Sequence, residues 1–536
     1  MAKSKRKSYF FLIFLISYIA TLFVRIVLVK LIGSKGVAYF SLPNELFFFF
    51  GFSVSYAIEQ SISILVENRI IRQQYGNAHM VLKAGCIVGA GVGLIVGALL
   101  MIFANRISGS LFGMPLSYMS MMVMIPSIPL MSVSGVFRGY LNGVGYRSVS
   151  VWSYLLFGLS YLICVFSLSG VFSDYGNKVS MLLRNEDFLY SYGAIGASLG
   201  ILVSSGITFI FMLVFFLMYR NRAAYDDDPY IKNQDSLGYN VINVFLNGLY
   251  SFAVMGSFFF MTLINELVLF KNEEKLVSVE FTFGEYYGKV FPFVYLPLCV
   301  IALFLYGNIK KAISAARREE YRNARERLGR VIHRCVTLGS FFSAMIIVLA
   351  ENIVNTFFEN SGEDTVIFVQ LEGIVILIGL FAFVMIKLLL SMKLDSLGAI
   401  VCGIGFVVHL IVLIVLTGTF KFSLYGAIIA NILYFAAISI VGFLFVTRYF
   451  QYTQEWVRTF AVSIVSALIV GVLSFLINKA LSLWLGNIIS LPIVFVLGAI
   501  EYMFLIALLR GYDEDELEGS AIGRLVISIG RLLGRM

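Results

Sequence analysis

The sequence contains few charged residues, few prolines and few histidines. Only 13% of its 536 residues are Asp, Glu, Lys or Arg, whereas about 25% is usual in a soluble protein. There are 8 prolines and 3 histidines. Hydrophobic residues make up 60% of the chain, and the mean hydropathy is +0.90. This composition excludes a soluble enzyme, a secreted disulfide scaffold and a disordered chain, and it predicts a polytopic membrane protein.

The chain also lacks the usual motifs of cofactor and nucleotide sites. Its cysteines are odd in number, lie in apolar stretches and show no CxxC or Cys/His spacing; they are Cys86, Cys164, Cys299, Cys335 and Cys402. It contains no GxxxxGK[ST] phosphate-binding loop and no recognisable nucleophile–base–orienter set. We therefore expect no disulfide, no metal, no cofactor and no ATP-driven export or other enzymatic activity.

The apolar runs predict an all-α fold with about fourteen transmembrane helices. Most runs have 21–28 residues, enough to cross about 30 Å of hydrocarbon. They are 9–32, 44–66, 81–104, 117–143, 150–172, 192–219, 239–268, 286–313, 328–350, 366–391, 397–417, 422–450, 456–478 and 486–509. The first run is too long for a signal peptide and is interpreted as a retained span.

The distribution of basic residues predicts the orientation. With the amino terminus in the cytosol, 26 Lys and Arg residues fall on the cytosolic side, 8 fall outside and 6 lie within spans. Both termini are therefore expected in the cytosol, with the protein in the plasma membrane. The net charge of +9 is attributed to topology, so no nucleic-acid partner is expected. The most basic connection, 310–330, has interleaved acids and is interpreted as a solvated helix face, the alternative being an anionic-lipid patch.

An internal repeat is the most informative pattern. R-x-x-Y-x-N-A begins at Arg72 and again at Arg318, and Y-G-A-I-x-A begins at Tyr192 and again at Tyr425. The offsets, 246 and 233 residues, are similar and span six predicted helices. Because six is even, the copies enter the membrane in the same direction, which predicts two parallel-repeat bundles with the substrate between them near mid-membrane.

The repeat gives the expected domain organisation. An N-terminal six-helix bundle occupies 1–220, a cytosolic linker 221–238, and the repeated six-helix bundle 239–450. Two additional transmembrane helices follow in 451–510, and 511–536 has the spacing of a cytosolic amphipathic tail. Prolines are expected to interrupt the helices that face the substrate path; they are Pro43, Pro126, Pro129, Pro292 and Pro297.

Three stretches resemble the MOP flippase superfamily. They are the loop 31–39, the R-G-Y-x-x-G pattern in 137–143, and the start of the sixth span at 192–200. The resemblance runs from about residue 9 to the end and is closest to the MurJ-type lipid II flippases, on the side of stage V sporulation protein B. It departs after Pro43 and Asn44, where those proteins often continue with two arginines and A-E-G.

The resemblance implies fourteen spans, two bundles and outward movement of lipid-linked cell-wall precursors. The expected function is an alternating-access flippase for an anionic polyprenyl-pyrophosphate-linked sugar, with lipid II favoured. Alternatives are a flippase for O-antigen, capsule or teichuronic acid precursors and a multidrug/cation antiporter; a membrane glycosyltransferase and a non-transporting scaffold are less favoured. The expected partners are this substrate, membrane lipids and cell-wall synthesis proteins, with the chain as a monomer.

Charges within the spans are costly, by at least about 2.5–3.5 kcal/mol each, and are candidates for the site. Arg25 resembles the arginine that lines the family's central cavity, and guanidinium pairs well with phosphate oxygens. The alternative is a structural ion pair. Lys30 is nearer the outer end, where snorkelling is the simpler explanation. Lys289 is a candidate second cation beside Arg25, again with snorkelling as the alternative.

Arg138 and Lys387 occupy repeat-related positions near the cytosolic ends of their spans, where they either capture a headgroup or snorkel. Glu45 and Glu59 are candidates for cation binding or for neutralising Arg25. Glu266, Glu372 and Glu501 are expected to be interfacial or paired, and His409 to be packed or hydrogen-bonded.

Overall fold

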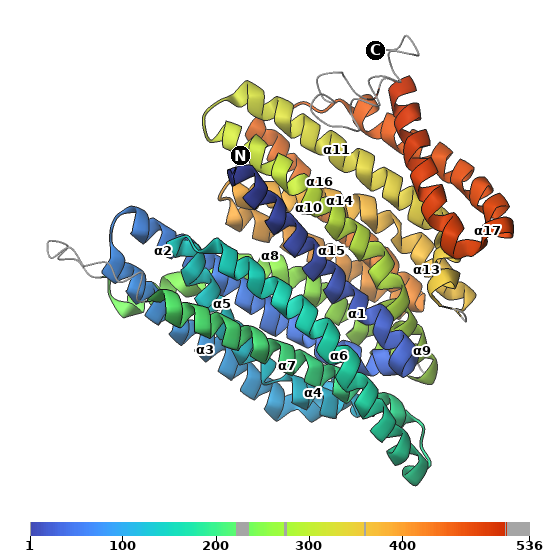
Figure 1. Ribbon diagram of the computed structural model, residues 1–536, viewed down its shortest axis with the longest axis horizontal. Coiled ribbons are helices and arrows are strands. Elements are labelled where there is room, and N and C mark those ends of the chain that lie inside the picture. The colour runs from blue at the N-terminus through green and yellow to red at the C-terminus, as the bar shows by residue number, and fades with distance from the viewer. Residues whose placement is uncertain (1, 221–234, 273–275, 359–360, 510, 512–536) are drawn as a thin grey trace. The chain divides into compact units, whose positions relative to one another are not determined.

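The computed structural model describes residues 2–220, 235–272, 276–358, 361–509 and 511. Within these residues the chain is helical and contains no β-strand. The elements, with α for α-helices and η for 3-10 and π segments, are α1 (Ala2–Leu46), η1 (Phe47–Phe52), α2 (Ser53–Ile71), α3 (Tyr75–Asn105), η2 (Arg106–Leu111), η3 (Pro115–Ser117), α4 (Tyr118–Met124), α5 (Ser127–Val144), α6 (Arg147–Leu183), α7 (Asp187–Arg220), α8 (Leu237–Asn272), α9 (Leu276–Glu285), η4 (Tyr286–Val290), α10 (Phe291–Ala316), α11 (Tyr321–Val348), α12 (Ala350–Phe357), α13 (Glu363–Glu372), α14 (Ile374–Ser391), α15 (Asp395–Leu413), η5 (Ile414–Thr419), α16 (Ser423–Phe450), η6 (Val457–Ala461) and α17 (Val462–Leu508) (Figure 1).

Twelve helical stretches in the described residues are long and apolar enough to cross a membrane. Their best 18-residue windows have mean hydropathies between 1.6 and 3.0. Since a span needs about 20 predominantly apolar residues, each of the twelve is sufficient. The prediction of an all-α, multi-pass membrane protein is therefore confirmed.

Two of these stretches are much longer than one crossing requires. Phe10–Ile71 has 62 residues and Val457–Leu508 has 52, whereas about 20 residues suffice for one crossing. Each contains one glycine outside the helical region, Gly33 with φ 68° and ψ 170°, and Gly486 with φ 68° and ψ 164°. These conformations are almost exclusive to glycine, so the path of the chain changes sharply at both positions.

The chain divides into two compact units. The first comprises Met1–Pro292 with Leu413–Ala427, and the second comprises Phe293–Val412 with Ile428–Met536. Helices α8 and α9 therefore pack with the helices that precede them, although the repeat assigns them to the second bundle. The repeat-based boundaries remain a prediction. Most of the predicted linker (221–234) and nearly all of the predicted tail (512–536) lie outside the described residues.

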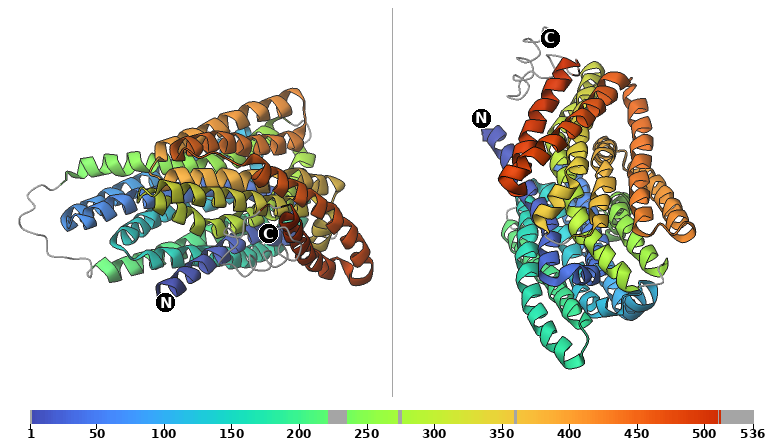
Figure 2. Two further views of the ribbon diagram at one scale, coloured as in Figure 1. Left: turned by 90° about the horizontal axis from the view of Figure 1, so that it is seen from above. Right: turned by 90° about the vertical axis from the view of Figure 1, so that its right-hand side faces the viewer.

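In the first unit, α6 and α7 lie side by side over much of their length, and α1 packs against α6 (Figures 1 and 2). Helix α5 packs closely on α2. A Cβ added at Gly135 would lie 2.3 Å from the Ser55 carbonyl oxygen. One added at Gly139 would lie 2.8 Å from that of Glu59. Because only glycine permits this approach, Arg138 on α5 is brought directly to α2.

The prolines expected to interrupt helices differ in their effect, and Pro297, like Pro43, lies inside a helix that continues through it. The fourth predicted span divides into α4 and α5 around Pro126, at the N-cap of α5. The π segment η4 ends just before Pro292, whose ring cannot accommodate regular helical bonding four residues earlier. By contrast, α1 continues through Pro43, and the π segment η1 follows it.

In the second unit, α11 packs against both α14 and α17. Gly339 of α11 allows this approach, since a Cβ there would lie 2.9 Å from a side-chain carbon of Leu377. The single hydroxyl hydrogen of Tyr502 in α17 has two acceptors within reach, the carbonyl oxygens of Thr337 at 3.0 Å and Ser463 at 3.1 Å. The last helix is thus attached to the unit by polar as well as apolar contacts.

Candidate functional site

Arg25 lies in the first part of α1, and only 6% of the residue is exposed. Its Nη2 donates to Glu45 Oε1 at 3.1 Å, which forms a buried ion pair. Its guanidinium carbon lies 3.9 Å from the ring centre of Tyr287 and 3.8 Å from that of Phe291. The carboxylate and the faces of the two rings stabilise a cation that has lost its water.

The Glu45 carboxylate is surrounded by hydrogen-bond donors. Besides Arg25, the hydroxyl of Tyr287 in η4 donates to Oε1, and the hydroxyl of Thr262 in α8 lies 2.5 Å from Oε2. Three segments of the first unit thus supply donors to one carboxyl group. These contacts connect α1, η4 and α8 through the Glu45 carboxyl group.

Two further side chains orient this cluster. The Tyr161 hydroxyl of α6 donates to Asn44 Oδ1 at 2.8 Å, and Asn44 Nδ2 donates to the Tyr287 hydroxyl at 2.6 Å. In this series of hydrogen bonds, Tyr161 donates to Asn44, Asn44 donates to Tyr287, and Tyr287 donates to Glu45. These hydrogen bonds orient the Tyr287 hydroxyl toward Glu45.

Two polar atoms of this region lack hydrogen-bond partners among the described residues. They are Nη1 of Arg25 and Oε2 of Glu266, both of which are buried. The other oxygen of Glu266, Oε1, lies 2.5 Å from Oγ of Ser41. Because nearly all buried polar groups in proteins are hydrogen-bonded, the two atoms are candidates for binding something that the chain does not supply.

Two π segments border or contain residues of the cluster around Arg25. The segment η1 begins two residues after Glu45, and η4 carries Tyr287 and Lys289. Single π turns in helices are frequent at functional sites. They alter the direction of the following side chains, and here they accompany the residues that surround Arg25.

Arg138 forms a second buried ion pair. It has no exposed surface, and its Nε lies 3.4 Å from Oε2 of Glu59. Its Nη2 donates to Ser55 Oγ at 2.5 Å, and its guanidinium carbon lies 4.5 Å from the Tyr154 ring centre. Glu59 also accepts from Tyr154, at 2.5 Å, and from Asn142 and Ser150, at 2.8 and 3.1 Å. This enclosed pair connects α2, α5 and α6.

The three candidate lysines lie in different surroundings. Lys289 is buried and pairs with Glu285 one helical turn earlier. Lys30 has an exposed side chain. Lys387 is half-buried in the second unit, with its Nζ 5.2 Å from the ring centre of Tyr306. The structure thus brings Arg25 together with Glu45 and Arg138 together with Glu59, and it assigns Lys289 a carboxylate partner of its own.

An ionic network that the sequence interpretation missed lies near the break in α1. Lys35 Nζ is 2.5 Å from Asp187 Oδ1, at the start of α7, and 3.6 Å from Glu280 Oε2 of α9. Tyr39 also donates to Glu280, at 3.0 Å. These residues lie in predicted connections between spans, where charges are common, so position alone gave no signal.

The other intramembrane polar residues are buried or partly buried. Glu372 is fully buried, and its Oε1 accepts from Tyr295 at 3.1 Å and from Asn431 at 3.2 Å. His409 is also fully buried, with its ring centre 6.1 Å from that of Tyr434. Glu501 is partly exposed. These contacts agree with paired or packed side chains, but Glu266 and Glu372 are too deeply buried to be interfacial.

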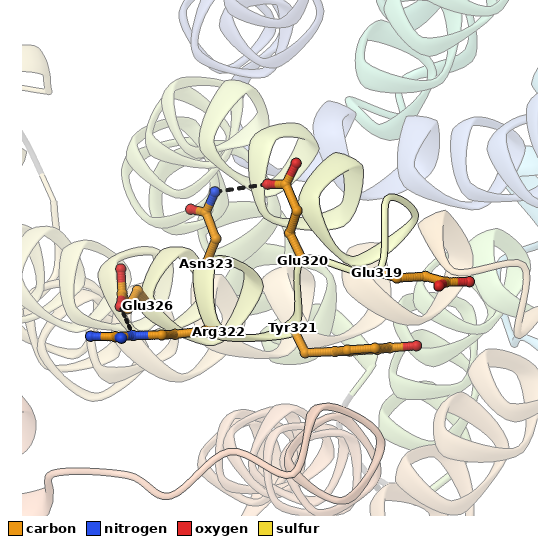
Figure 3. A pocket seen from close by; sticks show the side chains of 6 residues that line it. All are labelled: Glu319, Glu320, Tyr321, Arg322, Asn323 and Glu326. Carbon is orange, nitrogen blue, oxygen red and sulfur yellow. Dashed lines mark hydrogen bonds and ion pairs between the residues drawn. The ribbon is translucent and has the colours of Figure 1, made fainter.

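A surface hollow lies at the turn between α10 and α11 (Figure 3). Six residues line it: Glu319, Glu320, Tyr321, Arg322, Asn323 and Glu326. Arg322 pairs with Glu326 at 3.3 Å, and Asn323 donates to Glu320 at 2.9 Å. These mutual contacts fit the interpretation of 310–330 as a solvated helix face. No group of three or more His, Cys, Asp or Glu residues in the described ranges could hold a metal ion.

Comparison with known proteins identifies relatives along most of the chain. No known family profile matches it. Over 508 residues it is 21% identical to stage V sporulation protein B of Bacillus subtilis (strain 168), a match that covers 94% of this chain and 95% of that protein.

Solved structures share the fold. The lipid II flippase MurJ in its inward closed conformation matches with a TM-score of 0.65 and 15% identity, covering 94% of this chain and 98% of its own. An inward-facing multidrug resistance MATE family transporter of the MOP superfamily also gives 0.65, with 14% identity, covering 81% and 94%. The eukaryotic MATE transporter AtDTX14 gives 0.55, with 13% identity, covering 87% and 99%. The chain therefore has an all-α fold like that of MurJ and the MATE transporters.

Proposed function

We propose that this chain, a membrane transporter of the MOP superfamily and a distant homologue of stage V sporulation protein B, is a flippase for an anionic polyprenyl-pyrophosphate-linked sugar. Lipid II is the favoured substrate. The observation that carries the proposal is the buried guanidinium of Arg25, whose Nη1 has no hydrogen-bond partner among the described residues.

The chemistry of Arg25 suits a lipid pyrophosphate. Guanidinium presents paired donors that match phosphate oxygens, and its strength as a donor increases where water is excluded. The rings of Tyr287 and Phe291 hold the group in place, so little side-chain entropy is lost on binding. In this role Arg25 binds the headgroup, whereas Glu45 is its counterion in the empty site.

Arg138 is assigned a different role. Its Nε and Nη1 also lack hydrogen-bond partners among the described residues, but it is fully buried, and its ion pair with Glu59 is enclosed by Ser55, Tyr154 and Asn142. An enclosed pair of this kind is suited to holding α2, α5 and α6 together. We therefore assign Arg138 and Glu59 to positioning, and Arg25 and Lys289 to the anion.

The predicted topology belongs to the same proposal. If the 62-residue and 52-residue stretches each cross the membrane twice, reversing at Gly33 and Gly486, the twelve stretches become fourteen spans. An even number places both termini on the same side, which the basic residues assign to the cytosol. The π segments η1 and η4 begin 239 residues apart, close to the offsets of the repeated motifs, which supports two parallel-repeat bundles.

The extent of the matches favours a flippase over a drug transporter. The matches to stage V sporulation protein B and to MurJ each cover 94% of this chain, against 81% and 87% for the two MATE transporters. A match over nearly the whole chain is long enough to include the two additional helices predicted in 451–510. The proposed cycle is alternating access, in which the headgroup is captured from the cytosolic leaflet and released to the outer one.

Reconstitution tests this function and separates its rivals. The purified protein in liposomes should move fluorescent lipid II from the inner to the outer leaflet. The same assay with undecaprenyl-linked O-antigen and teichuronic precursors identifies the preferred sugar. Flipping of none of these lipids would refute the proposal. Cellular depletion is a second test, since cytosolic-leaflet lipid II should accumulate, with lysis, only if lipid II is the substrate.

A multidrug/cation antiporter is the second candidate, and the fully buried acids Glu266 and Glu372 favour it. Buried carboxylates suit cationic substrates, which Arg25 would repel. Increased resistance to cationic dyes in cells that express the protein, without flipping of lipid II in liposomes, would support this alternative.

A further inference from the structure

We propose that Glu266 is a proton-binding site, and that its protonation sets the charge of the Arg25 cluster and thereby its affinity for an anionic headgroup. The assignment of Glu266 as a proton-binding site depends only on the surroundings of Glu266. Its effect on headgroup affinity rests on the proposed flippase function.

Glu266 lies in α8 with no exposed surface. Its Oε2 has no hydrogen-bond partner among the described residues. Its Oε1 has one close partner, the Ser41 hydroxyl at 2.5 Å. A buried carboxylate with at most one donor has lost its water without replacement, whereas Glu45 nearby accepts from Arg25 and Tyr287 and also contacts the Thr262 hydroxyl, whose single hydrogen can go to Glu45 or to the Phe259 carbonyl oxygen. The two acids therefore occupy opposite environments.

The hydroxyl of Ser41 has a single hydrogen and two acceptors within reach. Its Oγ lies 2.7 Å from the carbonyl oxygen of Ala38 and 2.5 Å from Glu266 Oε1. When this hydrogen goes to Ala38, the short contact with Glu266 requires a hydrogen on the carboxyl group. A carboxylic acid at Glu266 thus lets Ser41 donate to Ala38 while it accepts from Glu266 Oε1.

The charges around Glu266 lead to the same protonation state. The charged groups that act on it are Arg25 and Glu45, both on α1. Since Arg25 and Glu45 already form an ion pair, an ionised Glu266 would add an uncompensated negative charge. Among the described residues, two other segments packed on α8 near this end carry no cation: η5 has no charged residue, and α9, whose Phe283 contacts Phe270, carries only the acids Glu280 and Glu285. Binding a proton makes the cluster neutral.

The consequence concerns the headgroup. When Glu266 is protonated, an anion approaching Arg25 faces one carboxylate, Glu45, and when Glu266 is ionised it faces two. Binding of the anion and binding of the proton therefore favour each other, and by linkage each increases the affinity for the other. Affinity for an anionic headgroup should then fall as the pH rises.

Infrared difference spectroscopy of the full-length protein in nanodiscs tests the proton site without any substrate. The wild type should show the carbonyl band of a protonated carboxylic acid, which Glu266→Gln removes and Ser41→Ala shifts by deleting the hydrogen-bond partner. Glu372→Gln, at another fully buried glutamate, is the matched control and should leave the Ser41-sensitive band in place. A band that persists in Glu266→Gln, or one that does not respond to Ser41→Ala, overturns the proposal.

Lipid II binding to the same nanodiscs tests the coupling. As the pH rises, the affinity of the wild type for lipid II should fall more steeply than the affinity of Glu266→Gln. The difference should be at most about tenfold per pH unit, as expected for one linked proton. Identical pH profiles, or a dependence on sodium in place of pH, contradict the coupling. A wild type that binds no lipid II refutes the proposed function, while the infrared bands still decide whether Glu266 holds a proton.

Discussion

Arg25 and Glu45 form an ion pair of 3.1 Å although they lie 20 residues apart in the single element α1. Along a straight helix, 20 residues extend about 30 Å, so the two groups could not meet. The break at Gly33 lies between them and turns the chain back on itself. The site therefore depends on one backbone conformation as much as on its charges.

Replacing Gly33 should destabilise the protein. Its φ of 68° and ψ of 170° lie in a region that is almost exclusive to glycine, and a side chain there costs about 1–3 kcal/mol. We expect Gly33→Ala to lower the thermal unfolding temperature in detergent. Gly91→Ala is the control, because a Cβ at this helical position meets nothing within 4 Å. Equal unfolding temperatures for the two variants would contradict the account of the break.

Removal of Arg138 should cost more stability than removal of a surface arginine. Arg138→Ala leaves Glu59 buried without its cation, a loss of about 3–5 kcal/mol for pairs of this kind. The control is Arg147→Ala, whose ion pair with Glu67 is exposed, with 62% of the Arg147 side chain accessible. Denaturant unfolding of both variants measures the difference. A similar small loss in both would show that the buried pair does not hold α2, α5 and α6 together.

These ion pairs show how far the sequence alone could lead. A charged residue within an apolar span is easily recognised in a sequence, so Arg25, Arg138, Glu45 and Glu59 were identified. The sequence also suggested that a glutamate neutralises Arg25. The pairing of Arg138 with Glu59 was not predicted. It depends on the close approach of α5 to α2 at Gly139, which no local pattern reveals.

The uncharged residues that surround Arg25 and Glu45 could not be predicted from the sequence. Tyr287, Thr262 and Tyr161 come from three segments far apart in the chain, and aromatic residues are too numerous for any one to stand out. The span count shows a related limit. Hydropathy separated the first two spans near Gly33, whereas the helical path there is nearly continuous and is resolved only by one glycine conformation.

Cysteine labelling should establish the orientation. We expect a cysteine at Glu186, in the predicted outer connection, to react with an impermeant maleimide in intact cells, in a background without the five native cysteines. A cysteine at Gln73, in the predicted cytosolic connection, should react only after permeabilisation. Both native residues are exposed, so neither site is blocked by packing. The reverse pattern would contradict the orientation with cytosolic termini.

Neutralising Glu45 should strengthen anion binding and weaken the fold. Glu45→Gln removes the counterion of Arg25 while keeping its shape, so the affinity for lipid II should rise. The unpaired guanidinium should lower stability by about 3–5 kcal/mol. Lipid II binding in nanodiscs and thermal unfolding measure the two effects. A fall in affinity would show that Glu45 supports the headgroup site and does not compete with it.

The most direct test of the central claim is the flipping rate of fluorescent lipid II in liposomes containing the wild type, Arg25→Ala or Arg147→Ala at equal reconstituted protein. The account predicts that the wild type and Arg147→Ala flip at similar rates. It also predicts that Arg25→Ala loses at least about tenfold, which corresponds to roughly 1.4 kcal/mol. Unchanged flipping in Arg25→Ala would contradict the assignment of this buried guanidinium as the group that binds the headgroup.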